Sequence, residues 1–184
     1  MAQSLPRSLT FPFDPTPDKR MKIILTTFAF LSLAFAANAQ GKVPSVSVQD
    51  LANKKIDTGS FSNDGKPYII NFWATWCAPC KRELQAIAEK YEGWQEKTGV
   101  KLIAISIDDS RSMARVSPYV NGQDWDFEFY LDPNGDFKRA LNVNNIPHTF
   151  LVDGNGAIVY QHNNYEPGDE NELFKKVLEL TSKN

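Results

Sequence analysis

Residues 71–84 read NFWATWCAPCKREL and contain the only two cysteines of the 184-residue chain, Cys77 and Cys80. Just before them, residues 68–75 (YIINFWAT) are nearly continuously apolar, as in a strand covered on both faces of a parallel sheet. Just after them, residues 81–97 have the apolar periodicity of an amphipathic helix. The apolar face of that helix comprises Leu84, Ile87, Ala88, Tyr91 and Trp94. The cysteines are therefore predicted to lie where a buried strand turns into a helix.

Strand and helix patterns alternate along the rest of the chain. Further strands are expected at residues 45–48, 55–61, 100–109, 127–131, 148–153 and 157–162. Further helical segments are expected at residues 110–120, after the turn 132–137, and at 169–183, where Leu173, Phe174, Val177 and Leu178 should face inward. The first helix should end near Gly99. This order predicts an α/β fold whose sheet is mixed, because the last two strands form a hairpin.

The spacing of the two cysteines is compatible with a redox-active pair, with half of a metal site, or with a structural disulfide. At a helix N-terminus, unpaired backbone N–H groups and the helix dipole favour an anion, so Cys77 should ionise more readily than a free thiol. Cys80, one turn further along, is placed to attack a mixed disulfide formed on Cys77. Pro79 lacks an N–H group and suits the first turn of a helix. A structural disulfide is disfavoured because it would close a very short loop and so remove little entropy from the unfolded chain.

An export signal is predicted at residues 21–39, MKIILTTFAFLSLAFAANA. This segment has a basic start, an apolar stretch, and small residues at Ala37 and Ala39, which together are typical of a secretory signal peptide. We expect cleavage before Gln40 and a periplasmic or other extracytoplasmic location. Because disulfides persist in oxidising compartments, this location suits a cysteine pair.

The apolar segment near the N-terminus has one alternative interpretation. Residues 23–39 could instead form an uncleaved membrane anchor, although the apolar run is shorter than the roughly 20 residues that a spanning helix needs. The Pro-rich residues 1–20 are interpreted as a mis-called N-terminal extension, with the true start at Met21. Residues 40–184 then form a single domain.

Charge and composition exclude one class of partner. The chain has 22 acidic and 20 basic residues, a formal net charge of −2, and no basic stripe with interleaved aromatic residues. We therefore expect no nucleic-acid binding. We also expect a monomer.

The chain resembles the exported TlpA/ResA-like thiol-disulfide oxidoreductases of the thioredoxin superfamily. NFWATWCAPCKREL is similar to their active-site strand, turn and helix, and NNIPHTFLVD (residues 144–153) to the loop in which a cis proline faces the dithiol. The resemblance implies a thioredoxin-like fold with a central mixed sheet flanked by helices. It also implies an N-terminal β extension, and a strand–helix unit inserted before the cis-proline loop.

The resemblance assigns the site residue by residue. It implies catalytic roles for Cys77, Cys80, Glu83 and Pro147, and client contacts by Trp76, Ala78, Pro79 and Ile146.

Two departures from relatives bear on the mechanism. Where thioredoxin has a proton-transferring aspartate, this chain has Asn71, which cannot ionise, so the role would pass to Glu83. The alternative for Glu83 is a solvated charge in the run Lys81, Arg82, Glu83. His148 stands where relatives commonly have threonine, and it either tunes the charge of the pair or caps a strand.

Three functions are compatible with these residues. The first is a thiol-disulfide oxidoreductase of the cell envelope, with no cofactor beyond a redox-active Cys77–Cys80 disulfide. The sequence leaves the direction open between reductant and oxidant, and the resemblance favours a reductant. Such a reductant would be kept reduced by a membrane thiol electron carrier and would act on client proteins with cysteines or disulfides, such as apocytochrome c or another exported protein. The second is a metal-binding or metallochaperone module, but Cys77, Cys80, His148 and His162 lack the spacing of a zinc site, so we expect no metal. The third, a peroxidase of the same superfamily, would need a single peroxidatic cysteine after a Pro-x-x-x-Thr element, and residues 40–184 contain no such element.

Overall fold

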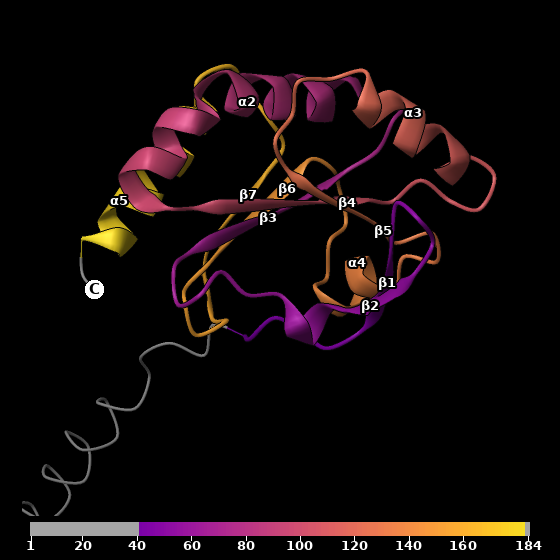
Figure 1. The fold of residues 1–184 in the computed structure, drawn as a ribbon, viewed down its shortest axis with the longest axis horizontal. Coiled ribbons are helices and arrows are strands. Elements are labelled where there is room, and N and C mark those ends of the chain that lie inside the picture. Colours follow the sequence, from indigo (N-terminus) through magenta and orange to yellow (C-terminus); the bar gives the residue numbers. More distant parts are fainter. Residues whose placement is uncertain (1–40, 183–184) are drawn as a thin grey trace, which may run out of the picture. The chain divides into compact units, whose positions relative to one another are not determined.

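The computed structural model describes residues 41–182, which contain a seven-stranded sheet of order β2-β1-β5-β4-β3-β6-β7 (Figure 1). The strands are β1 (Ser47–Asp50), β2 (Lys55–Asp57), β3 (Tyr68–Trp73), β4 (Lys101–Ser106), β5 (Glu128–Leu131), β6 (His148–Val152) and β7 (Ile158–Asn163). Strand β4 pairs in parallel with β3 and with β5, and the other pairings are antiparallel. The predicted mixed sheet is therefore confirmed.

Helices cover both faces of this sheet. They are α2 (Ala78–Thr98), α3 (Val116–Asn121), α4 (Asp136–Ala140) and α5 (Asp169–Thr181), with 3₁₀ turns η2 (Thr58–Ser60) and η3 (Met113–Arg115). In Figure 1, α2, α3 and α5 lie on one side of the strands and α4 lies on the other. The order β4, η3, α3, β5, α4, β6 places a strand and a helix, β5 and α4, before the proline loop and so confirms the predicted insertion. Strands β1 and β2 form the predicted N-terminal extension.

Strand β3 divides the core between these two faces. All six of its residues are buried, and alternate side chains point to opposite sides of a sheet. Ile69 and Trp73 belong to the hydrophobic cluster under α2 and α5, whereas Ile70 and Phe72 belong to the cluster under α4. By this alternation the polar residue Asn71 points to the α2 side, into an otherwise apolar layer.

Helix α2 begins and ends where the sequence predicts. Cys77 is its N-cap, and its sulfur accepts a hydrogen bond from the backbone N–H of Cys80 at 3.3 Å. Gly99 ends the helix in the left-handed conformation (φ 65°), and its N–H bonds to the carbonyl of Gln95. Glycine adopts this conformation without a steric penalty.

The structure corrects two expectations about element limits and faces. The strand expected at 55–61 ends at Asp57, because the Asp57 carboxylate accepts the N–H of Gly59 at 2.7 Å and starts the η2 turn. Leu178 is 40% exposed rather than inward, because α5 buries Leu173 and Val177, with Leu180 continuing the same helical face.

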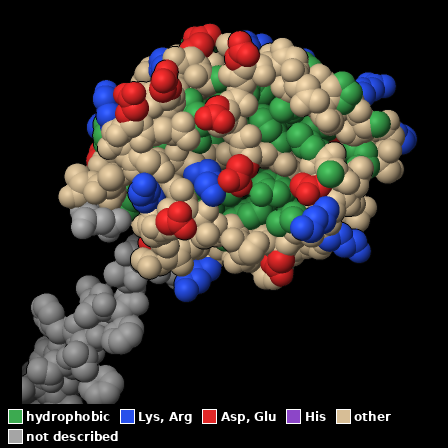
Figure 2. All heavy atoms as spheres, viewed as in Figure 1, with side chains coloured by type: hydrophobic (Ala, Val, Ile, Leu, Met, Phe, Trp, Pro, Cys, Tyr) green, Lys and Arg blue, Asp and Glu red, His purple; other side chains and the backbone are tan. Residues whose placement is uncertain are grey.

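The predictions for the N-terminal segments concern residues that the structure does not describe. The extension 1–20, the export segment 21–39 and the alternative anchor 23–39 lie outside the described residues. Within residues 41–182, no helix combines the length and the apolar character required to cross a bilayer. On the face shown in Figure 2, acidic and basic side chains are interspersed, and hydrophobic side chains are visible near the middle.

Candidate active site

The two cysteines form a disulfide in the first turn of α2. Cys80 is fully buried and Cys77 nearly so, whereas the preceding Trp76 is 62% exposed. Ala78 is exposed and Pro79 half-buried, so both border the disulfide at the protein surface. Pro79 stands in the first turn of the helix, as predicted. The sulfur of Cys77 is therefore the one near solvent, and that of Cys80 lies in the core.

A buried carboxylate holds the turn that leads to Cys77. Asp108 accepts the backbone N–H of Thr75 at 2.8 Å and its hydroxyl at 2.7 Å. The hydroxyl of Ser106 donates to the same carboxylate at 2.8 Å. Sequence reasoning did not single out Asp108. An acidic residue at the end of an apolar strand was the signal that could have identified it.

The proline loop lies at the same edge of the sheet. Strand β6 pairs with β3 so that His148 is opposite Phe72, which places Pro147 beside the end of the strand that leads to the cysteines. The Ile146–Pro147 peptide bond is cis. Ile146 packs against the hydrophobic cluster that contains Cys77 and Cys80. Among residues 41–182, the backbone N–H and carbonyl of Ile146 have no hydrogen-bond partner.

Glu83 lies inside the protein and not on its solvated face. It is 2% exposed, three residues after Cys80 and hence on the same side of α2. Its carboxylate accepts hydrogen bonds from the Asn71 amide at 2.9 Å and from the Thr149 hydroxyl at 2.8 Å. The Asn71 amide also donates to the Thr149 hydroxyl at 2.8 Å. This network joins α2 to two adjacent strands, β3 and β6.

Burial controls the protonation of Glu83. Removal from water raises the pKa of this carboxyl to about 7, and the hydrogen bonds from Thr149 and Asn71 oppose only part of that rise. A carboxyl with this pKa can accept and return a proton near neutral pH. Thr149 was missed in the sequence, although a hydroxyl within the apolar strand HTFLV was a signal of a buried polar contact.

The two histidines do not join the cysteines. His148 is buried, stacks on Phe150 with ring centroids 4.5 Å apart, and lies 3.3 Å from the Gln161 side chain through Nε2. Burial lowers the pKa of His148, which favours its neutral form. His162 lies 3.3 Å from the Asp169 carboxylate. In residues 41–182, no three His, Cys, Asp or Glu side chains are grouped so that they could hold a metal ion.

The sheet order and the disulfide at the start of α2 define the molecule as a thioredoxin-like thiol-disulfide oxidoreductase. The chain belongs to the AhpC/TSA family, whose model matches residues 39–161.

The chain is similar to named thiol-disulfide oxidoreductases and to a solved thioredoxin-like structure. The thiol-disulfide oxidoreductase ResA of Bacillus thuringiensis subsp. konkukian is 31% identical over 137 residues, which are 74% of this chain and 76% of that protein. The thiol:disulfide interchange protein DsbE of Haemophilus influenzae is 30% identical, covering 84% of this chain and 89% of that protein. Among solved structures, an uncharacterized thioredoxin-like protein from Porphyromonas gingivalis is 50% identical, with a TM-score of 0.71 over 80% of this chain and 96% of that one.

Proposed function

We propose that this protein reduces disulfides in exported client proteins, with Cys77 as the nucleophile. The Cys77 thiolate attacks one sulfur of a client disulfide, the client S–S bond breaks, and the first client thiolate leaves. A mixed disulfide between Cys77 and the client results. The position of Cys77 at the N-cap of α2 supports this assignment, because the helix dipole and the Cys80 N–H stabilise a thiolate there.

The second step needs a proton acceptor inside the protein. Cys80 has no access to solvent, so its thiol passes its proton to the Glu83 carboxylate, and the resulting thiolate attacks the sulfur of Cys77. The Cys77–Cys80 disulfide forms, the second client thiolate leaves, and two electrons have passed to the client. The buried Glu83 carboxyl, with its pKa raised to about 7, is the observation that carries this proposal.

Client binding uses the surface around the disulfide. The backbone groups of Ile146 pair with an extended client segment, and Pro147 presents that edge beside the dithiol. Trp76, Ala78 and Pro79 provide the apolar contact surface next to Cys77.

The cellular setting is part of the proposal. The sequence pattern of residues 21–39 supports export to the cell envelope. Similarity to relatives named thiol-disulfide oxidoreductase and thiol:disulfide interchange protein supports exchange with the thiols and disulfides of client proteins. The resemblance of residues 71–84 and 144–153 to the TlpA/ResA-like proteins supports a client such as apocytochrome c, and a membrane thiol electron carrier that returns the disulfide to its reduced state.

Insulin reduction tests the proposed exchange with client disulfides. The dithiothreitol-recycled protein should accelerate precipitation of insulin chains, and Cys77→Ser should abolish this activity. Cys80→Ser should instead accumulate a covalent adduct with the client through Cys77, visible by mass spectrometry. Adducts that form mainly through Cys80 in the Cys77→Ser variant would reverse the assignment, and wild-type protein inert towards insulin would contradict the proposed reduction of client disulfides.

A further inference from the structure

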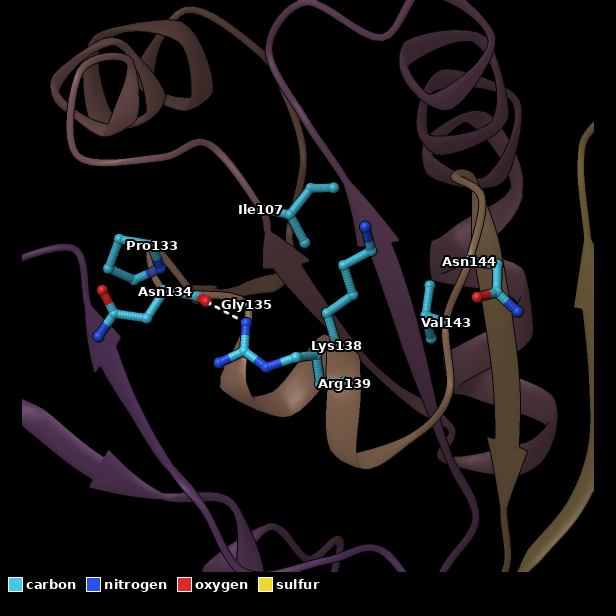
Figure 3. A pocket seen from close by; sticks show the side chains of 8 residues that line it. All are labelled: Ile107, Pro133, Asn134, Gly135, Lys138, Arg139, Val143 and Asn144. Carbon is cyan, nitrogen blue, oxygen red and sulfur yellow. Dashed lines mark hydrogen bonds between the residues drawn. The ribbon is translucent and has the colours of Figure 1, made fainter.

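A cavity of about 490 Å³ lies between the inserted strand–helix unit and the segment that leads to Pro147 (Figure 3). Ile107 lines one side, Pro133 and α4 another, and Val143 and Asn144 a third. The mechanism described above uses none of these residues.

This cavity borders the active edge of the sheet. The backbone N–H of Ile107 donates to the carbonyl of Trp73 at 2.9 Å, which ties the cavity wall to the strand before the cysteine turn. Ile107 and Ile146 both pack against the cluster that contains Cys77 and Cys80. On the opposite side, Asn144 is followed within two residues by Ile146, whose backbone is proposed to pair with a client. A client segment lying along Ile146 would therefore place neighbouring side chains at this cavity.

The cavity carries an uncompensated positive charge. In Figure 3, the Lys138 side chain extends from α4 between the 133–135 turn and the 143–144 segment, toward the Ile107 side. Within residues 41–182, its ammonium group has no hydrogen bond or ion pair. Arg139, by contrast, is bound to the Asn134 carbonyl at 2.6 Å and to the Asp136 carboxylate at 2.5 Å. The residues that line the cavity include no carboxylate.

Two acidic residues close to Lys138 in the sequence are already engaged. Asp132 is buried and accepts the backbone N–H of Lys138 at 2.8 Å, which fixes the start of α4. Asp136 is paired with Arg139. Lys138 is thus left to attract a carboxylate from outside the chain.

We propose that this cavity is a client subsite for a glutamate or aspartate side chain near the client's cysteine. The walls formed by Ile107, Pro133 and Val143 suit the methylene groups of such a side chain, and Lys138 pairs with its carboxylate. A free phosphate would leave these apolar walls without a partner. The subsite rests on the proposed function, because it selects among clients of the same dithiol.

Matched peptides test the subsite. Peptides that carry a single cysteine activated with a neutral 2-thiopyridyl group are reacted with the reduced protein, with glutamate or glutamine placed in turn at each flanking position. At one or two positions we expect the glutamate peptide to react about twofold to fivefold faster at low salt, with the preference fading at high salt. Lys138→Ala should abolish the preference and Lys138→Glu should invert it.

Controls separate failure of the subsite from failure of the function. Lys175→Ala, which removes an exposed cation from α5, should keep the preference, and every variant should react equally with the small disulfide 2,2′-dithiodipyridine. Fast but equal reaction of the glutamate and glutamine peptides with wild-type protein would overturn the subsite alone. So would a preference that survives in Lys138→Ala, or wild-type protein that binds inorganic phosphate at Lys138 without preferring glutamate. Failure of wild-type protein to react with any peptide would overturn the proposed function as well.

Discussion

At the scale of single residues, Glu83 is held in a position where its charge is unfavourable. Deep burial favours the protonated form of this carboxyl group over the charged form. Its two hydrogen-bond donors, Asn71 and Thr149, are neutral. Asp169 and Glu170 add like charge from α5 and raise its pKa further. The protein retains an energetically unfavourable group next to its buried thiol, which is the pattern expected of a proton acceptor.

This burial predicts a pH dependence of stability. The pKa of Glu83 is raised from 4.5 to about 7 in the folded protein, so between these values the folded state keeps a proton that the unfolded chain releases. The free energy of unfolding of oxidised protein should therefore fall as pH rises through this window, by a contribution on the order of 3 kcal/mol. Urea unfolding at several pH values measures it. Glu83→Gln should lack this component, and a pH profile identical to wild type would contradict the burial of an ionisable group there.

At the scale of elements, helix α2 carries the site and both of its ends are defined by single residues. Cys77 caps the N-terminus, and Gly99 ends the helix with positive φ. A Cβ at Gly99 would also lie 2.7 Å from Cδ of the Lys66 side chain. Gly93, in the same helix, has no atom within 4 Å of such a Cβ.

Two glycine-to-alanine changes should therefore have opposite effects. Gly99→Ala should lower the free energy of unfolding by about 1–2 kcal/mol, because alanine is strained in the left-handed conformation. Gly93→Ala should raise it by about 0.5–1 kcal/mol, because alanine favours a helix interior. Urea unfolding of both variants beside wild type decides this. Equal effects of the two changes would show that the conformation of Gly99 does not matter.

The sequence predicted long periodic elements better than short ones. Helix α2 and strands β3 and β4 follow from periodicity and apolar runs, whereas the end of β2 depends on one side-chain hydrogen bond at Asp57. The cysteine turn could be found from local spacing alone. The environment of Glu83 could not, because its partners Asn71 and Thr149 are brought together only by the pairing of β3 with β6. For the same reason, the cavity beside Lys138 had no local signature.

At the scale of the whole molecule, the two faces of the sheet carry different parts of the proposed site. The α2 side holds the cysteine pair and Glu83, the proposed proton acceptor, whereas the inserted unit on the α4 side lines the cavity beside the proposed client-binding segment. The cysteine pair and the cavity both lie near the end of β3, beside Pro147. The inserted unit thus extends a thioredoxin-like core with the surface that we propose selects clients.

Export is predicted for the full chain. The small residues at Ala37 and Ala39 should direct cleavage before Gln40, and the mature protein should be recovered in the extracytoplasmic fraction. N-terminal sequencing of protein isolated from that fraction tests it. Recovery of uncleaved chain in the membrane fraction would instead support an anchor at residues 23–39.

The rate at which Cys80 resolves a mixed disulfide on Cys77 tests the central claim most directly. Stopped-flow measurement of release of the second client thiol should give a rate that rises through about pH 7 in wild-type protein, as Glu83 becomes able to accept a proton. Glu83→Gln should slow this step by about 10² to 10⁴-fold while the first attack by Cys77 changes little, and Glu92→Gln, an exposed change on the same helix, should have no effect. Resolution by Glu83→Gln at the wild-type rate and with the wild-type pH dependence would contradict the account.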